Sequence, residues 1–303
     1  MTDRPAPPTL TAFAWTLLVT LGVIWGAAFF FARVAVDEVL PLTLVLYRVS
    51  IAAVTLHVIL AVLGRSIHPY VHRWRDFLVL GLLNNAVPFS LLFAGQTALS
   101  AGLASILNAT MPIWTVVIGH VLTSDERMSA HKVAGVALGF VGVATMLGPA
   151  ATGVLTAPAW AMLCVIGGAM SYGFAVVFAK RFSAMPPLVT ATGQLTASSA
   201  LMLPVVLVID GVPEVTLSGE TWAAIAALAV ISTALAYILY FRVLAIAGAV
   251  NGSLVTLLVP PSAILLGWLF LSERLDAFAW MGLALIGSGL VVLDGRLLQK
   301  LRG

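Results

Sequence analysis

Long apolar runs dominate the sequence and are separated by short stretches that contain charged residues, proline or glycine. A helix needs about 20 apolar residues to cross a bilayer, whereas a membrane β-strand alternates apolar and polar residues over about ten positions. The runs here are continuous, so they predict transmembrane α-helices. We expect ten, at residues 11–32, 40–63, 76–94, 102–121, 131–148, 158–179, 187–209, 220–241, 248–271 and 277–294.

The composition supports an all-α polytopic membrane protein. Of 303 residues, 61% are hydrophobic and 9% are charged, whereas a soluble domain has about 25% charged residues. Ten spans use about 200 residues, which leaves only short loops and no separate soluble domain. The net charge of +3 is spread along the chain, so we expect no nucleic-acid partner. Cys164 is the single cysteine and cannot form an intrachain disulfide.

Basic residues are distributed unevenly between the two sides of the membrane on which the loops of a ten-helix protein would lie. With a cytoplasmic N-terminus, twelve of the 15 lie in cytoplasmic segments, two lie outside and one, Arg48, lies inside the second span. This bias follows the positive-inside rule. It predicts a multi-pass protein of the cell inner (plasma) membrane with both termini in the cytoplasm.

The two halves of the sequence match at an offset of 147–148 residues. Trp25-Gly26 aligns with Tyr172-Gly173, and Phe31 aligns with Phe178. Further matches are residues 101, 105, 112 and 119 on 249, 253, 260 and 267, Glu126-Arg127 on Glu273-Arg274, and Gly135 and Gly142 on Gly282 and Gly289.

Each half contains five predicted spans, and an odd number reverses the orientation of the second copy. We therefore expect two inverted five-helix repeats, residues 1–149 and 150–303, around a central cavity. Inverted repeats are typical of transporters, because two similar halves can open a central site to either side in turn.

These motifs resemble the EamA-type drug/metabolite transporter family over nearly the whole chain. Each half has a Trp/Tyr-Gly-x4-Phe first helix and a fourth helix ending Pro-x6-Gly-x4-Ser before Glu-Arg. Pro41 and Arg48 also resemble the first-repeat pattern, whereas the second half has Leu195 at the position of Arg48. Within the family the chain is most similar to bacterial aromatic and neutral amino-acid exporters, which implies export of such solutes.

Small and polar residues recur at helical spacing in the fourth and ninth spans. Asn108 and Pro112 lie on one such face, and Thr256 and Pro260 lie on its counterpart, with Asn251 near its start. The functional interpretation is a substrate path in which the two prolines permit helix bending. The alternative is close helix packing by small residues.

Other candidate cavity residues are carboxamides and aromatic residues. They could bind the amino and carboxyl groups of a zwitterion and its apolar side chain; the alternative is hydrogen bonding between helices. We expect Trp25, Asn84, Asn85, Trp114, Tyr172, Tyr237 and Tyr240 in the binding site, with Trp25 and Tyr172 either closing its cytoplasmic side or lying at the membrane interface.

Arg48 is the single charge well inside the predicted hydrocarbon region. Such a charge costs about 2.5–3.5 kcal/mol on insertion scales, so it needs compensation. It could bind a substrate carboxylate, act as a gating latch, or pair structurally with carbonyl groups. The glycines of the fifth and tenth spans permit close helix approach, either between the repeats or in self-association; they are Gly135, Gly139, Gly142, Gly282, Gly287 and Gly289.

The acidic residues all fall in loops or at helix ends, so the carboxylate relay of many proton-driven pumps is missing. The motifs HExxH and GxSxG are also missing, which argues against an intramembrane enzyme. We expect a carrier that needs no cofactor or metal, with a small-molecule substrate and the lipid bilayer as partners, as a monomer or loose homodimer. Amphipathic drugs or nucleoside-like metabolites are the alternative substrates.

Overall fold

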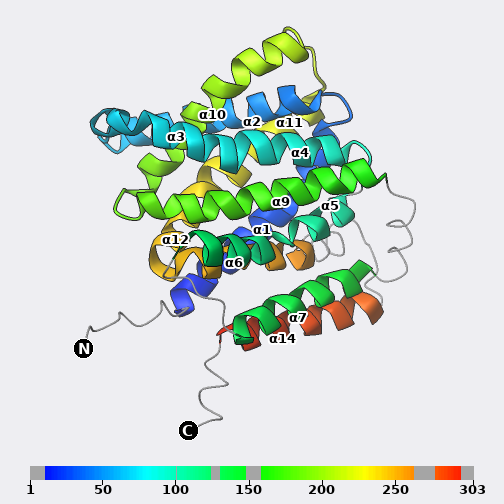
Figure 1. Cartoon of the computed structure of the whole chain (residues 1–303). Helices are drawn as coiled ribbons and strands as arrows, with labels where there is room; N and C mark the ends of the chain where they lie inside the picture. Colours follow the sequence, from blue (N-terminus) through cyan, green and yellow to red (C-terminus); the bar gives the residue numbers. More distant parts are fainter. Residues whose placement is uncertain (1–10, 100, 124–129, 148–157, 263–276, 295–303) are drawn as a thin grey trace, which may run out of the picture.

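The computed structural model describes residues 11–99, 101–123, 130–147, 158–262 and 277–294 (Figure 1). The regular elements in these ranges are all helical, and the longer helices lie side by side in a bundle. In the first half the helices are α1 (Ala12–Ala35), α2 (Pro41–Val62), η1 (His68–Arg73), α3 (Trp74–Gly81), η2 (Leu82–Ala86), α4 (Val87–Gln96), α5 (Ala101–Asn108), α6 (Met111–Leu122) and α7 (Ala130–Leu147).

The second half is likewise helical, with its 3-10 helix η4 after its first long helix and not after its second. Its helices are α9 (Ala159–Ala179), η4 (Lys180–Phe182), α10 (Pro187–Ile209), α11 (Gly219–Ala226), η5 (Ala227–Leu235), α12 (Ala236–Ser253), a helix over residues 255–262, and α14 (Ala277–Asp294).

Seven helical stretches in the described ranges are long and apolar enough to cross a membrane, which makes this a multi-pass membrane protein. They cover Ala12–Ala35, Pro41–Val62, His68–Gln96, Leu103–Leu122, Ala159–Phe182, Pro187–Ile209 and Gly219–Gly248. Shorter apolar helices lie at Val133–Gly142 and Trp280–Gly289. Residues 263–271 of the expected ninth span lie outside the described residues.

Two expected spans differ from the structure. The fourth is not one continuous helix, because residues 109 and 110 form a turn between α5 and α6, directly before Pro112. The eighth was expected to end at residue 241, but the helix continues to Gly248, where the backbone takes φ 80° and ψ 173°. Glycine tolerates a positive φ without a steric penalty, so the chain turns there.

Two long helices contain π-helical turns at matching positions. η2 interrupts the α3–α4 helix, and η5 interrupts the α11–α12 helix. Shifted by 148 residues, residues 82–86 fall within η5. Such turns are rare and are found frequently at functional sites.

The helices pack in pairs that connect the two halves. α2 packs on α10, α7 on α14, α4 on α9, and α1 on α12. α7 and α14 lie side by side at one edge of the molecule (Figure 1). Their contact is very close, because a Cβ atom at Gly289 would lie 2.6 Å from the Gly139 nitrogen. Of the two expected roles of these glycines, the structure shows close approach between helices of the two halves, although a Cβ at Gly287 would meet nothing within 4 Å.

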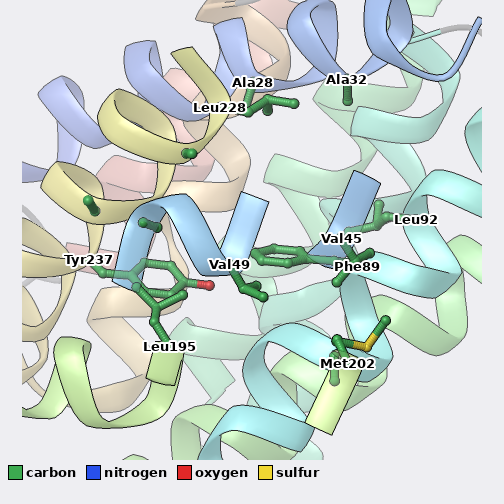
Figure 2. Close-up of a cluster of buried hydrophobic side chains, with 14 of the residues drawn as sticks. Ala28, Ala32, Val45, Val49, Phe89, Leu92, Leu195, Met202, Leu228 and Tyr237 are labelled. Atoms are coloured by element: carbon green, nitrogen blue, oxygen red, sulfur yellow. The ribbon is translucent and has the colours of Figure 1, made fainter. Parts of the chain in front are cut away.

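The largest buried cluster joins α1, α2, α4, α10 and α12. Figure 2 shows Phe89 extending past Val45 and Val49 toward Tyr237, with Leu195 beside the tyrosine ring. Phe89 and Tyr237 of this cluster also line the cavity described below.

Candidate functional site: a cavity around Arg48

A cavity lies within the bundle, between helices of both halves. It encloses a volume of about 70 Å³ and opens at one side. It extends from mid-bundle toward the ends of α1 and α4, where Ala32 and Gln96 line it. The lining residues are Trp25, Ala28, Phe29, Ala32, Arg48, Asn84, Phe89, Leu92, Phe93, Gln96, Asn108, Met111, Tyr172, Tyr237, Tyr240, Thr256 and Val259.

Aromatic rings form much of the cavity wall. The Trp25 ring lies 5.1 Å from the Tyr240 ring and 6.5 Å from the Tyr237 ring, measured between centroids. The Phe89 ring lies 6.4 Å from that of Tyr172. The indole N–H of Trp25 donates to the Ser232 carbonyl at 3.1 Å, which fixes the ring against η5. These pairs are stable edge or tilted arrangements that leave apolar faces toward the cavity.

Arg48 brings a positive charge into this aromatic wall. The residue is 6% exposed. Its Nε donates to the Thr233 hydroxyl at 2.7 Å, and its guanidinium carbon lies 3.8 Å from the centre of the Phe89 ring. No acidic residue pairs with Arg48 in the described part of the chain. The cation is held by one hydroxyl and an aromatic face.

A hydrogen-bonded seam runs beside the cavity between η2, α10 and α12. The Tyr237 hydroxyl donates to Asn85 Oδ1 at 2.6 Å. Asn85 Nδ2 donates to Ser198 Oγ at 2.8 Å, and Asn84 Nδ2 donates to Gln194 Oε1 at 3.1 Å. All of these side chains are buried. The seam therefore joins the two halves through fixed side-chain pairs.

Two buried polar atoms of cavity-lining residues have no hydrogen-bond partner in the part of the chain that the structure describes. They are Oδ1 of Asn108, which is 6% exposed, and the hydroxyl oxygen of Tyr240, which is 3% exposed. A buried polar atom without a partner costs free energy. A polar ligand in the cavity would supply the missing partner.

The structure places most expected site residues around this one cavity. Trp25, Asn84, Asn108, Tyr172, Tyr237, Tyr240, Thr256 and Arg48 all line it.

Three expected binding residues do not line the cavity. Asn85 is fully buried in the seam. Trp114 packs against Gly173 of α9, and Asn251 Nδ2 donates to the Ala247 carbonyl at 2.9 Å. Asn251 lies just beyond the Gly248 break, whereas Trp114 lies beyond the turn that separates α5 from α6.

The two prolines flank breaks in the helices. Pro112 occupies the first turn of α6, directly after the break. Pro260 lies in the helix of residues 255–262, after the breaks at Gly248 and Leu254. Both prolines are buried.

The α10 partners of the seam are not among the residues predicted from the sequence. Gln194 and Ser198 are fully buried and bond to Asn84 and Asn85. Their spacing, with Thr190 four residues earlier, places polar groups on one face of an apolar helix. That periodicity could have identified them.

One end of the bundle is tied by contacts between its two halves. Asp210 Oδ2 accepts hydrogen bonds from the Thr43 backbone N–H at 3.0 Å and from the Thr43 hydroxyl at 2.7 Å, which caps the first turn of α2. Nearby, Glu38 accepts from the Ser218 backbone N–H at 3.0 Å. The backbone and hydroxyl of Ser218 hold the Glu38 pKa below its ordinary value. This tie is thus present at neutral pH and is lost when the pH falls through that pKa.

The opposite end carries a second set of contacts between the halves. Arg73 donates to the Arg181 carbonyl at 3.1 Å and forms an ion pair with Asp76. The Phe77 and Phe182 rings stack at 5.5 Å. The cavity therefore lies between two tied ends.

No group of His, Cys, Asp and Glu side chains in the described ranges is arranged to bind a metal ion. His57 is exposed and its Nε2 lies 3.0 Å from the Thr196 hydroxyl, away from the cavity lining.

Proteins of similar sequence include several that are described as transporters. An uncharacterized transporter, YoaV of Bacillus subtilis, is 25% identical over 90% of this chain and 94% of its own. Protein PecM of Dickeya dadantii is 29% identical over 89% of each chain. A probable terminal-alkyne amino-acid exporter of Streptantibioticus cattleyicolor is 26% identical over 97% of each chain.

The fold also occurs in a solved structure. One crystal structure shares the fold with a TM-score of 0.75 at 20% identity, over 94% of this chain and 98% of the other. The EamA-like transporter family model matches twice, at residues 12–148 and 159–293. The chain therefore belongs to the EamA-like transporter family and is a multi-pass membrane transporter.

Proposed function

We propose that this transporter exports small neutral or zwitterionic metabolites, above all aromatic and other apolar amino acids, from the cytoplasm by alternating access. The observation that carries the proposal is the cavity, where aromatic walls surround a single cation and two unpartnered polar atoms. An aromatic amino acid has a carboxylate, an ammonium group and an apolar ring, which match these features. The probable amino-acid exporter among the relatives supports the same substrate class.

The proposed architecture is ten transmembrane helices in two inverted repeats, residues 1–149 and 150–303. Three observations support it: the two separate family matches, the π-helical turns at matching positions, and the pairing of equivalent helices. α2 pairs with its counterpart α10 and α7 with its counterpart α14, while α4 on α9 mirrors α12 on α1. A twofold axis between the halves would produce this pairing.

The proposed substrate site consists of Trp25, Asn108, Tyr172, Tyr237, Tyr240 and Thr256, with Arg48 as its charge. Asn84 lines the cavity and also belongs to the seam, because its Nδ2 donates to Gln194. Asn85 acts through Tyr237 as a positioning residue. The polar ties at each end of the bundle serve as gates, which open in turn as the halves move.

Efflux from proteoliposomes tests this function. Vesicles that contain the purified protein are preloaded with labelled phenylalanine, leucine or glutamate. They should release phenylalanine and leucine faster than protein-free vesicles that are loaded in the same way. Runs with and without a pH gradient separate proton coupling from facilitated efflux. Release of no amino acid would contradict the amino-acid proposal and favour the alternative of amphipathic drugs or nucleoside-like solutes.

A further inference from the structure

We propose that the cavity recognises its ligand by the carboxylate, through Arg48, and not by the ammonium group. The transporter should therefore accept apolar monocarboxylates that lack an amino group and reject the corresponding amines. This inference rests on the proposed function for the cavity but extends its substrate class beyond amino acids.

The first step is the unused hydrogen-bonding capacity of Arg48. Its Nε donates to Thr233, while its two terminal nitrogens donate to no residue that the structure describes. Phe89 lies 3.8 Å from the guanidinium carbon and covers one face of the group. The edge that carries the terminal nitrogens is the side available to a carboxylate, which arginine binds with two parallel hydrogen bonds.

The second step is the absence of a countercharge for an ammonium group in the described lining. The lining contains Arg48 and no aspartate or glutamate. A carboxylate would neutralise a buried cation that has no acidic partner. An ammonium group would instead be desolvated beside that cation, where like charges repel.

The third step concerns what an ammonium group can reach. The unpartnered atoms Asn108 Oδ1 and Tyr240 Oη are neutral oxygens. Hydrogen bonds from an ammonium group to them are useful but do not balance its charge. These hydrogen bonds explain why the cavity can accept a zwitterion. They do not favour a zwitterion over a carboxylate ligand that lacks the ammonium group.

The apolar part of the ligand has a clear place. Phe89 and Phe93 lie 3.8 Å and 5.7 Å from the Arg48 guanidinium carbon, measured to the ring centroids. A carboxylate bound at Arg48 would thus have aromatic side chains beside it, and Trp25 and Tyr240 extend the aromatic wall. A ring one or two carbon atoms from a carboxylate fits this arrangement.

Three ligands with the same phenyl ring test the inference: phenylalanine, 3-phenylpropanoate, which lacks the amine, and phenethylamine, which lacks the carboxylate. Their binding to the purified full chain is measured by calorimetry, and their inhibition of phenylalanine efflux is measured in proteoliposomes. We expect 3-phenylpropanoate to bind within about tenfold of phenylalanine, and phenethylamine to bind at least about tenfold more weakly than both.

Variants of α2 assign the effect to Arg48. Arg48→Gln should weaken binding of 3-phenylpropanoate by about 10–100-fold, whereas Arg48→Lys should retain part of it because the charge remains. His57→Gln on the same helix is the matched control, because His57 is exposed and away from the cavity. Thermal unfolding shows that each variant is folded. If Arg48→Gln does not fold, Arg48→Lys and the three ligands on the unaltered protein still decide.

The inference is overturned if 3-phenylpropanoate does not bind, or if phenethylamine binds as tightly as phenylalanine. It is also overturned if folded Arg48→Gln binds 3-phenylpropanoate with unchanged affinity. Failure of the proposed function looks different. In that case 3-phenylpropanoate binds through Arg48, which supports the inference, but no amino acid leaves the vesicles. Phenylalanine efflux inhibited equally by both analogues contradicts the inference alone.

Discussion

Tyr237 and Tyr240 lie one turn apart on α12, yet their hydroxyl groups are in opposite situations. The Tyr237 hydroxyl donates to Asn85 Oδ1 and belongs to the seam between the halves. The Tyr240 hydroxyl is equally buried but has no partner. One phenol therefore stabilises the fold, while the other is free to meet a ligand.

Replacing each tyrosine by phenylalanine should separate these two roles. Tyr237→Phe leaves Asn85 Oδ1 without its donor and should lower the free energy of unfolding by about 1 kcal/mol. Tyr240→Phe removes an unpartnered buried group and should leave stability unchanged or slightly higher, while it weakens phenylalanine efflux. Thermal unfolding in detergent and proteoliposome efflux measure the two effects. Equal destabilisation by both changes would contradict the assignment.

At the residue scale the sequence pointed to eight of the 17 residues that line the cavity, but it did not show which of them bind other side chains and which are open to a ligand. Arg48 and Tyr240 were predictable because a charge or phenol in an apolar span stands out. The role of Asn85 was not, since its partner Ser198 lies 113 positions along the chain. Pairing across such distances depends on tertiary packing, which one sequence does not reveal.

At the scale of elements, α7 and α14 form a pair whose backbones touch. A Cβ atom on Gly289 would lie 2.6 Å from the Gly139 nitrogen and 2.7 Å from the Gly135 carbonyl oxygen. Backbone atoms cannot move aside as a flexible side chain does. The glycines therefore set the distance between these helices.

Alanine substitutions in α14 test this contact with an internal control. Gly289→Ala should force the helices apart and destabilise the protein by about 1–3 kcal/mol. Gly287→Ala, on the same helix, meets nothing within 4 Å and should be neutral or stabilising by up to about 1 kcal/mol. Melting temperatures of the two purified variants measure the difference. Similar values for both would argue against a close contact at Gly289.

Helix positions were predictable from hydrophobicity, and Pro112 marked the fourth span as a place where the helix could bend. The extension of the eighth span and the π-helical turns were not predictable in this way. The break between α5 and α6 and the extension to Gly248 depend on local backbone geometry. The π-helical turns gave no signal in the pattern of apolar residues. The backbone hydrogen bonds of the folded chain are what identify these turns.

At the scale of the whole molecule, the number of spans determines where the termini lie. Ten spans place both termini on one side, and an odd number such as the seven long stretches alone would place them on opposite sides. The distribution of basic residues predicts that the shared side is the cytoplasm.

Reporter fusions measure this directly. A fluorescent protein that folds only in the cytoplasm should be bright at either terminus, and alkaline phosphatase, active only outside, should be inactive at both. The matched control is alkaline phosphatase fused after Asp210, in the loop after α10, where it should be active. A terminus that is active with alkaline phosphatase would contradict the ten-helix arrangement.

The π-helical turns also bear on how the two halves could move. Each π-helical turn holds extra backbone relative to an α-helix, and sliding it by one residue turns the side chain it passes by about 100°. Thr233 in η5 bonds Arg48, and Asn85 in η2 bonds Tyr237. If the π-helical turn moved by one residue, the Thr233 or Asn85 side chain would rotate away from its hydrogen-bond partner. The rest of the helix would keep its register. We therefore expect both π-helical turns, which lie at matching places in the two halves, to be positions where a contact between the halves can be released.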